Sequence, residues 1–190
     1  MNYLHDFFAR WTPLGASAER WDKPVTDVLS MHPRTFEITC AAFADTRRHR
    51  LECGLFWYGN KSQAGAFEVV AIVVPKQRNY EGFYFIEGEA IEEMSDHTRE
   101  FGWINLAQVH THPSAWVDHS TYDDDHTNSR NALSIVMPHY GRLATDLLKV
   151  IGVHEFLDEK WRYLTLRRAR QRIYLNPKCA LPKLIDLRML

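Results

Sequence analysis

Cysteine is scarce in this sequence and occurs in no recognised pattern. The three cysteines, Cys40, Cys53 and Cys179, are odd in number and lack CxxC or CxxH spacing. Such spacing is the usual sign of a disulfide framework or of a zinc site built from thiolates. The sequence therefore predicts reduced and mostly buried thiols.

The chain also lacks an excess of charge, a long apolar run and a glycine-rich phosphate loop. Its formal net charge of -1 at pH 7 provides no overall attraction to nucleic acid or to an anionic membrane. No apolar run approaches membrane-spanning length, and the first residues, which include Asp6 and Arg10, lack the continuous apolar core of a signal peptide. A GxxxxGK[ST] loop is absent as well. We therefore expect a cytoplasmic protein with no nucleic-acid, nucleotide or membrane partner.

Apolar side chains, in contrast, are abundant. Of the 190 residues, 45% are hydrophobic and 13% aromatic, which is ample for one buried core. Apolar periodicity and capping residues predict helices over 33–50, 87–100 and 120–130. Short apolar runs predict strands over 51–59, 67–74, 103–109, 131–138, 150–156 and 161–166, the first two forming a hairpin. This mixed order indicates an α/β (α+β) fold with a single central mixed sheet flanked by helices.

The chain divides into three parts by composition. Residues 1–30 are expected to form an N-terminal extension, 31–166 the folded domain and 167–190 a basic, leucine-rich tail. The aromatic residues of the extension suit packing onto the core or onto a partner. They are Phe7, Phe8, Trp11 and Trp21. The tail opens with arginines at 167, 168, 170 and 172, but no stacking motif accompanies them, so we expect a solvated or partner-facing tail and no nucleic-acid contact.

Two histidines follow the apolar run 103–109. Side chains two apart on a strand share a face, so His110 and His112 can point at one object, and Pro113 marks the end of the strand. Ser120 then begins a helix, with Asp123 three residues on as a carboxylate variant of the capping box. Two imidazoles and a carboxylate at adjoining element ends form a ligand set for a divalent metal.

The number of ligands suits a catalytic zinc. Such a zinc takes three protein ligands, here His110, His112 and Asp123, and keeps a fourth position for water. Amide hydrolysis also needs a group that accepts a proton and delivers it to the leaving amine. Glu52 is the best candidate for that group, because its strand could lie beside the histidine strand. Ser120 could donate a hydrogen bond to the oxyanion or serve only as the helix cap, and both roles can coexist.

These residues together resemble a known signature. Glu52, the run His110-Thr111-His112-Pro113, the seven residues 113–119, Ser120, two further residues and Asp123 are similar in type and spacing to the JAMM signature of the JAB/MPN metalloprotease family. The similarity covers roughly residues 34–166.

The resemblance implies a fold, an activity and a partner. The fold would be JAB/MPN-like, with cytidine-deaminase-like layering. The activity would be that of a zinc isopeptidase or peptidase, in which His110, His112 and Asp123 hold one Zn²⁺, Glu52 is the general acid/base and Ser120 stabilises the oxyanion. The partner would be a ubiquitin-like protein or its conjugate, whose tail is held extended by strand addition. The compact length is similar to bacterial members encoded with ubiquitin-like conjugation systems, including antiphage systems.

Other interpretations of the same residues remain open. A peptidase of this kind could instead release an amino acid or a small adduct from a sulfur-carrier-like protein. Two histidines and one carboxylate also make the facial triad of non-haem iron(II) oxygenases. A non-catalytic MPN scaffold is a further alternative, although a scaffold has no need of the full set. Among the polar neighbours Asp118, His119, Asp124, Asp125 and His126, we expect His126 at the surface and the aspartates of the first helical turn to be explained by the helix dipole.

Overall fold

The computed structural model describes residues 27–62, 65–127, 132–142 and 146–189. The strands are β1 (Leu29–Met31), β2 (Gly54–Lys61), β3 (Phe67–Val74), β4 (Arg78–Asn79), β5 (Tyr84–Phe85), β6 (Ile104–Thr111), β7 (Leu133–Met137), β8 (Gly152–Leu157), β9 (Lys160–Tyr163), β10 (Ile173–Leu175) and β11 (Lys183–Asp186). The helices are α2 (Thr35–Ala42), α3 (Ala44–Arg48), α4 (Gly88–Arg99), α5 (Thr121–His126), α6 (Leu147–Val150) and α7 (Leu166–Arg172), followed by the 3-10 helix η1 (Leu187–Met189). The aromatic residues of the expected extension and the expected helical residues 128–130 lie outside the described ranges.

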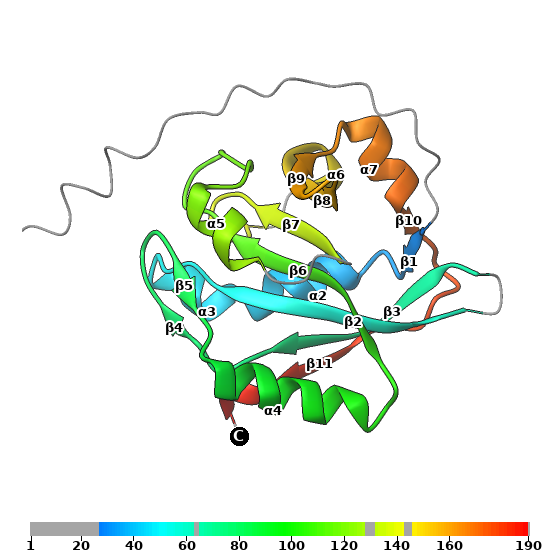
Figure 1. Ribbon diagram of the computed structural model, residues 1–190, viewed down its shortest axis with the longest axis horizontal. Helices are drawn as coiled ribbons and strands as arrows, with labels where there is room; N and C mark the ends of the chain where they lie inside the picture. The colour runs from blue at the N-terminus through cyan, green and yellow to red at the C-terminus, as the bar shows by residue number, and fades with distance from the viewer. Residues whose placement is uncertain (1–26, 63–64, 128–131, 143–145, 190) are drawn as a thin grey trace, which may run out of the picture.

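Most of the strands join in one curled mixed sheet (Figure 1). Its order is β10-β1-β3-β2-β6-β7-β8-β9, and β11 also pairs with β3. Strand β2 runs antiparallel to both β3 and β6, whereas β6 and β7 are parallel. Strands β4 and β5 form a separate two-stranded ribbon. The expected central mixed sheet is present, and so is the predicted hairpin, formed by β2 and β3.

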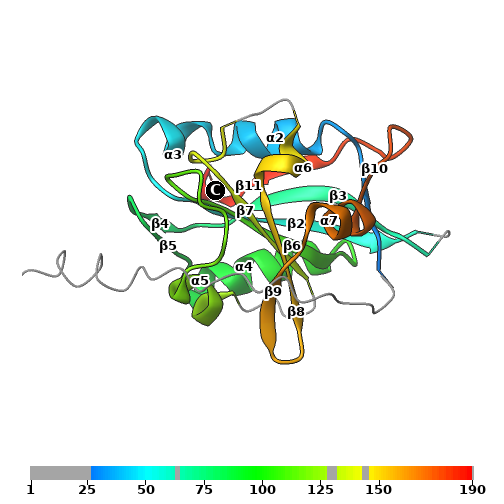
Figure 2. The same ribbon diagram turned by 90° about the horizontal axis from the view of Figure 1, so that it is seen from above.

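Helices cover both faces of the sheet, with α2 and α4 on opposite sides (Figure 2). Strand β2 shows why both faces need a cover. Leu55 and Trp57 pack in one apolar cluster with Phe36 of α2, whereas Phe56 packs in a second cluster with Met94 of α4. Successive side chains of a strand point to opposite faces, so the consecutive apolar residues 55–58 of β2 must be buried on both. Strand β2 therefore holds the centre of the fold.

The segment 33–50, expected to be one helix, is divided into two. Helix α2 ends where Phe43 adopts φ -84° and ψ -1°, and α3 begins at the next residue. The side chain of Phe43 is fully buried at this turn. The basic residues Arg47 and Arg48 lie in the last turn of α3, where cations are favoured by the helix dipole.

Residues 167–190, expected to be a basic tail, contribute α7, β10 and β11. Strand β10 pairs with β1, and β11 pairs with β3. Two of the arginines in this segment meet acids of the domain, since Arg172 lies 2.9 Å from Glu155 and Arg170 lies 3.7 Å from Asp146. This part of the chain therefore adds two strands to the sheet, and two of its arginines form ion pairs within the domain.

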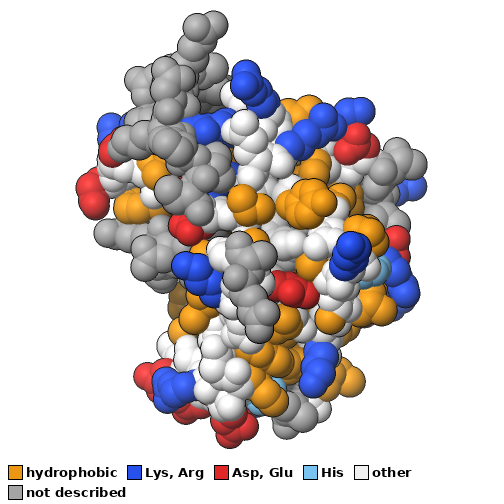
Figure 3. Space-filling model, turned by 90° about the vertical axis from the view of Figure 1, so that its right-hand side faces the viewer, with side chains coloured by type: hydrophobic (Ala, Val, Ile, Leu, Met, Phe, Trp, Pro, Cys, Tyr) orange, Lys and Arg blue, Asp and Glu red, His pale blue; other side chains and the backbone are white. Residues whose placement is uncertain are grey.

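The surface and the cysteines agree with the composition. All three cysteines are free and buried, as predicted. Hydrophobic side chains on the right-hand face of Figure 1 stand among charged ones (Figure 3). Within the described ranges, no helix has both the length and the apolar character needed to cross a membrane.

Candidate metal centre

The paired histidines lie where strand β6 ends. His110 belongs to β6 and His112 follows its last residue. Strand β6 lies between β2 and β7, and Gly54 and Val136 are in register with His110. The ladder continues past the strand, because the N–H of His112 donates to the carbonyl of Met137 at 2.9 Å. Backbone pairing therefore fixes both imidazoles, whose side chains are 0% and 4% exposed.

Helix α5 brings a carboxylate to the same point. Ser120 caps the helix, and its Oγ accepts from the N–H of Asp123 at 3.2 Å. In return Asp123 Oδ2 accepts from the N–H and from the hydroxyl of Ser120, each at 2.7 Å. The capping box predicted from the sequence is confirmed. It fixes the carboxylate of Asp123 in the first turn, facing the histidines.

Three ligand atoms converge at this place. The Nε2 atoms of His110 and His112 are 3.2 Å apart. Asp123 Oδ1 lies 3.2 Å from Nε2 of His110, and Oδ2 lies 3.2 Å from Nε2 of His112. No other group of three His, Cys, Asp or Glu side chains in the described part of the chain brings its ligand atoms within 4.8 Å of one another. The group can hold a metal ion.

The chemistry of these donors fits a cation. His112 Nδ1 lies 3.0 Å from the carbonyl oxygen of Trp116, which can only accept, so this nitrogen carries the proton. In the neutral ring Nε2 then presents a lone pair to Asp123 and His110, and a cation between these atoms relieves their repulsion. His110 Nδ1, in contrast, is buried with no hydrogen-bond partner among the described residues.

Glu52 reaches the site from the neighbouring strand. It lies just before β2, with its N–H donating to the carbonyl of Tyr80 at 2.7 Å and its carbonyl accepting from Asn79 Nδ2 at 2.7 Å. The next residue, Cys53, is tied to Thr111 by two hydrogen bonds. The structure therefore places Glu52 beside the end of β6, although the strand begins at Gly54 and not at residue 51 as expected.

The two acids of the site differ in their electrostatics. Burial opposes the ionisation of Asp123, but its interactions with the imidazoles of His110 and His112 hold its pKa well below the usual range. Burial and the negative charge of Asp123 raise the pKa of Glu52 to about 9. A divalent cation held by His110, His112 and Asp123 would favour the carboxylate form of Glu52, because opposite charge favours ionisation.

A groove of about 430 Å³ opens against Asp123. Its walls include the aromatic rings of Phe56, Tyr58, Tyr84, Phe85 and Tyr122. The hydroxyl of Tyr84 accepts from Gln108 at 2.7 Å, and its ring lies 5.8 Å from the ring of His110. Gly54 makes room for it, since a Cβ there would lie 2.2 Å from the Tyr84 ring. The metal centre therefore has an aromatic groove on its Asp123 side.

A second histidine cluster lies next to the ligands. The rings of His119 and His154 stack with centroids 3.9 Å apart, and the ring of His119 lies 6.0 Å from that of His110. His119 pairs with Asp124 at 2.9 Å, and His154 pairs with Asp118 at 3.0 Å. Burial is the largest influence on both rings and lowers their pKa values. The sequence did not single out His154, because a lone histidine in a strand carries no local signal.

The remaining polar neighbours are at the surface. Asp124, Asp125 and His126 are exposed. His126 stacks on Tyr122 with centroids 3.9 Å apart, and its Nδ1 lies 2.9 Å from the carbonyl of the same residue. The expected surface position of His126 is confirmed.

Comparisons with known proteins show a shared fold. No protein-family model and no curated protein matches the sequence. A protein from Salinibacter ruber, solved in solution, has a TM-score of 0.54 at 14% identity over 80% of this chain and 95% of its own. A protein from Desulfitobacterium hafniense has a TM-score of 0.54 at 12% identity with the same coverage. At these identities the likeness shows a shared fold alone.

Proposed function

We propose that the protein is a zinc-dependent isopeptidase or peptidase that removes or processes a ubiquitin-like modifier. The observation that supports this most strongly is the convergence of the ligand atoms of His110, His112 and Asp123. Glu52 is buried just before the neighbouring strand β2, where it senses the charge of Asp123. The resemblance of these residues to the JAMM signature assigns Zn²⁺ to the three ligands and JAB/MPN-like layering to the sheet. Nitrogen and carboxylate ligands of this number suit a catalytic zinc with one open position.

Each residue then has a distinct task. Zinc, when bound, supplies the Lewis acidity that makes water nucleophilic near neutral pH. Glu52 accepts the proton of the attacking water at its side-chain carboxylate and delivers it to the leaving amine nitrogen as the C–N bond breaks. Ser120 turns its hydroxyl from Asp123 to the oxyanion, while its N–H continues to hold Asp123 at 2.7 Å.

The groove beside Asp123 suits an extended peptide tail. Its aromatic walls can bury apolar side chains of the tail. The hydroxyl of Tyr122 in α5 donates to the carbonyl of Tyr84 in β5 at 3.0 Å and so connects two elements that line the groove. Within the described residues, β5 pairs only with β4, so its other edge is open to strand addition. A ubiquitin-like protein ends in such a tail. On the same resemblance we further propose that the protein acts in the cytoplasm, in a bacterial conjugation system of the antiphage type.

Cleavage assays test this function directly. The zinc-loaded protein is incubated with ubiquitin-like proteins joined to a reporter by a linear peptide bond and, separately, by an isopeptide bond to lysine. We expect metal-dependent release of the modifier, which stops in chelator and returns with Zn²⁺. Purification without oxygen, followed by metal analysis, distinguishes the zinc peptidase from the iron(II) oxygenase. Stoichiometric iron together with oxygen uptake would contradict the proposal.

A further inference from the structure

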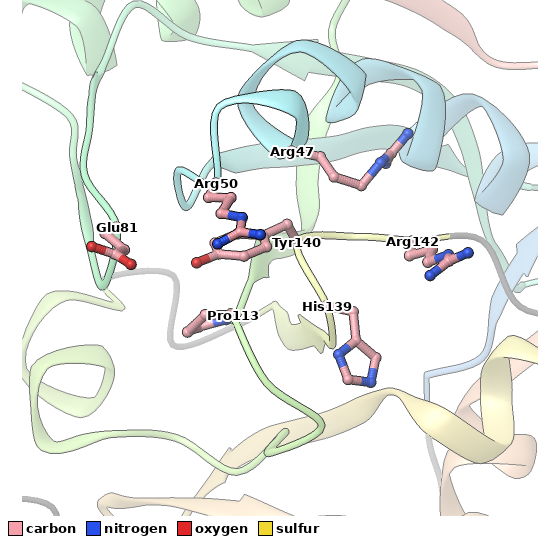
Figure 4. A pocket seen from close by; sticks show the side chains of 7 residues that line it. All are labelled: Arg47, Arg50, Glu81, Pro113, His139, Tyr140 and Arg142. Carbon is pink, nitrogen blue, oxygen red and sulfur yellow. The ribbon is translucent and has the colours of Figure 1, made fainter.

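A second pocket, of about 700 Å³, lies on the His112 side of the metal centre. It is lined by Arg47, Arg50, Glu81, Pro113, His139, Tyr140 and Arg142 (Figure 4). Pro113 directly follows a ligand, and the N–H of Tyr140 donates to the carbonyl of His112 at 2.8 Å. The aromatic groove touches the site at Asp123, whereas this pocket lies next to His112 through Pro113 and Tyr140.

The walls of this pocket are held in place. Arg47 donates from Nη1 to the carbonyl oxygens of Cys40 at 3.0 Å and Gly141 at 2.9 Å, which joins α3 to the turn after β7. In that turn His139, Tyr140 and Gly141 have successive φ values of 52°, 55° and 72°. Left-handed backbone is unfavourable for residues with a Cβ and occurs more often at functional sites than elsewhere. The turn therefore presents His139 and Tyr140 to the pocket at a local energetic cost.

Two arginines of the pocket form no ion pair with an acid among the residues that the structure describes. Arg50 and Arg142 make no side-chain hydrogen bond or ion pair with any residue that the structure describes. Most other described arginines do pair with an aspartate or glutamate; these are Arg34, Arg48, Arg78, Arg99, Arg170, Arg172 and Arg188. The acid of the pocket, Glu81, stands at the opposite end of Figure 4 from Arg142. The pocket therefore carries uncompensated positive charge beside the reaction centre.

Tyr140 joins the wall of this pocket to the metal centre, because its N–H donates to the carbonyl of His112 at 2.8 Å. Burial raises the pKa of its phenol, the negative charges of Glu81 and Glu52 raise it further, and Arg50 lowers it. A group bound in the pocket would therefore lie beside the backbone that carries His112.

We propose that this pocket binds an acidic segment of the protein substrate on the side opposite the modifier tail, with Arg50 and Arg142 as its specificity-determining residues. The inference rests on the proposed peptidase function, because it assigns the two hollows to the two sides of one scissile bond. Arginine suits this role, since its guanidinium binds carboxylates through paired hydrogen bonds.

A peptide carboxylate fits the pocket better than a nucleic-acid phosphate. Glu81 faces the same space and repels a chain of phosphates, but it accepts hydrogen bonds from the backbone amides of a peptide. A peptide therefore satisfies both signs of charge on the wall. A phosphodiester backbone pairs with the arginines alone and is repelled by Glu81.

Binding of defined probes tests the inference without turnover. Fluorescence anisotropy follows the zinc-loaded full-length protein with a labelled peptide of alternating glutamate and glycine, with the same peptide carrying glutamine, and with an oligothymidylate of equal length. We expect the glutamate peptide to bind about tenfold more tightly than the glutamine peptide, and the preference to fall with salt. The double variant R50A/R142A should lose this preference. R48A/R99A, which removes the same charge from ion-paired surface arginines, should keep it.

A variant that removes the negative charge of the pocket gives a second test with the opposite expected effect. Glu81→Gln keeps an acceptor and removes the negative charge, so it should tighten binding of the glutamate peptide about threefold. Equal binding of the two peptides, or unchanged preference in R50A/R142A, would overturn the inference. Tighter binding of the oligothymidylate would overturn it in favour of nucleic acid. If the peptides discriminate but no conjugate is hydrolysed, the peptidase function fails while the acidic-peptide pocket stands.

Discussion

Two histidine clusters lie next to each other in the described part of the chain, and in only one of them do three ligand atoms converge. The first is His110 and His112 with Asp123, and the second is His119 and His154 with their aspartates. Both pairs of imidazoles are buried, with side chains at most 4% exposed. Residue type and burial therefore do not separate the two clusters.

The direction of the ring nitrogens separates them. In the first cluster the two Nε2 atoms lie 3.2 Å apart, and each lies 3.2 Å from one oxygen of Asp123. In the second the rings stack, and each nitrogen that bonds has a partner of its own. His119 Nε2, for example, bonds Ser134 Oγ at 2.7 Å. Convergence of donors makes a metal site, whereas dispersion into separate pairs makes a buried hydrogen-bond network.

The largest effect is expected when a converging ligand is removed. His112→Ala takes away one of three donors, so the protein should lose zinc and fall to background hydrolysis. Elemental analysis and the cleavage assay measure the two losses on the same preparation. Full zinc occupancy in this variant would show that the metal is held elsewhere.

Glu52→Gln should separate chemistry from metal binding. The amide cannot accept the proton of the attacking water, and we expect hydrolysis to fall by about 10²–10⁴-fold, the usual contribution of a general base. Zinc content should not change, because Glu52 is not a ligand. Glu37→Gln, an exposed carboxylate in α2, is the matched control. Retention of most activity in Glu52→Gln would remove Glu52 from its assigned role.

His119→Phe breaks the stacked cluster and should spare the metal. The ring volume remains, but Ser134, which is fully buried, loses its partner, and an unsatisfied buried hydroxyl costs about 1–3 kcal/mol. Denaturant unfolding measures this loss of stability. His126→Phe changes an exposed ring and serves as the control, with little expected effect. Loss of zinc from His119→Phe would mean that the two clusters are one site.

Chelation should have the smallest effect on the fold. The two apolar clusters on either side of the sheet do not depend on the metal, so the far-UV circular dichroism spectrum should stay the same at room temperature while activity disappears. Unfolding in chelator would identify the metal as structural.

Local signals account for what could be predicted. Strand β3 is bounded as predicted, because an apolar run ends at Pro75, and the helix start at Ser120 was marked by its own capping residues. Those signals depend on neighbours in the sequence. The convergence of His110, His112 and Asp123 could be expected because a strand end and the following helix start are only a few residues apart.

Contacts between distant residues could not be predicted in this way. Strands β10 and β11 are three and four residues long, too short for periodicity, and their partners lie far away in β1 and β3. Thr165 caps α7 by accepting from the N–H of Arg168, although the run 161–166 resembled a strand throughout. The pairing of His154 with Asp118 spans 36 residues and has no counterpart in sequence spacing.

The neighbouring acids Asp123 and Asp124 allow the most direct test, since each belongs to one of the two clusters. Zinc content is measured by elemental analysis of Asp123→Asn and Asp124→Asn beside the unaltered protein. The account predicts one zinc per chain in the unaltered protein and in Asp124→Asn, and none in Asp123→Asn. Zinc retained by Asp123→Asn, or lost from Asp124→Asn alone, would contradict it.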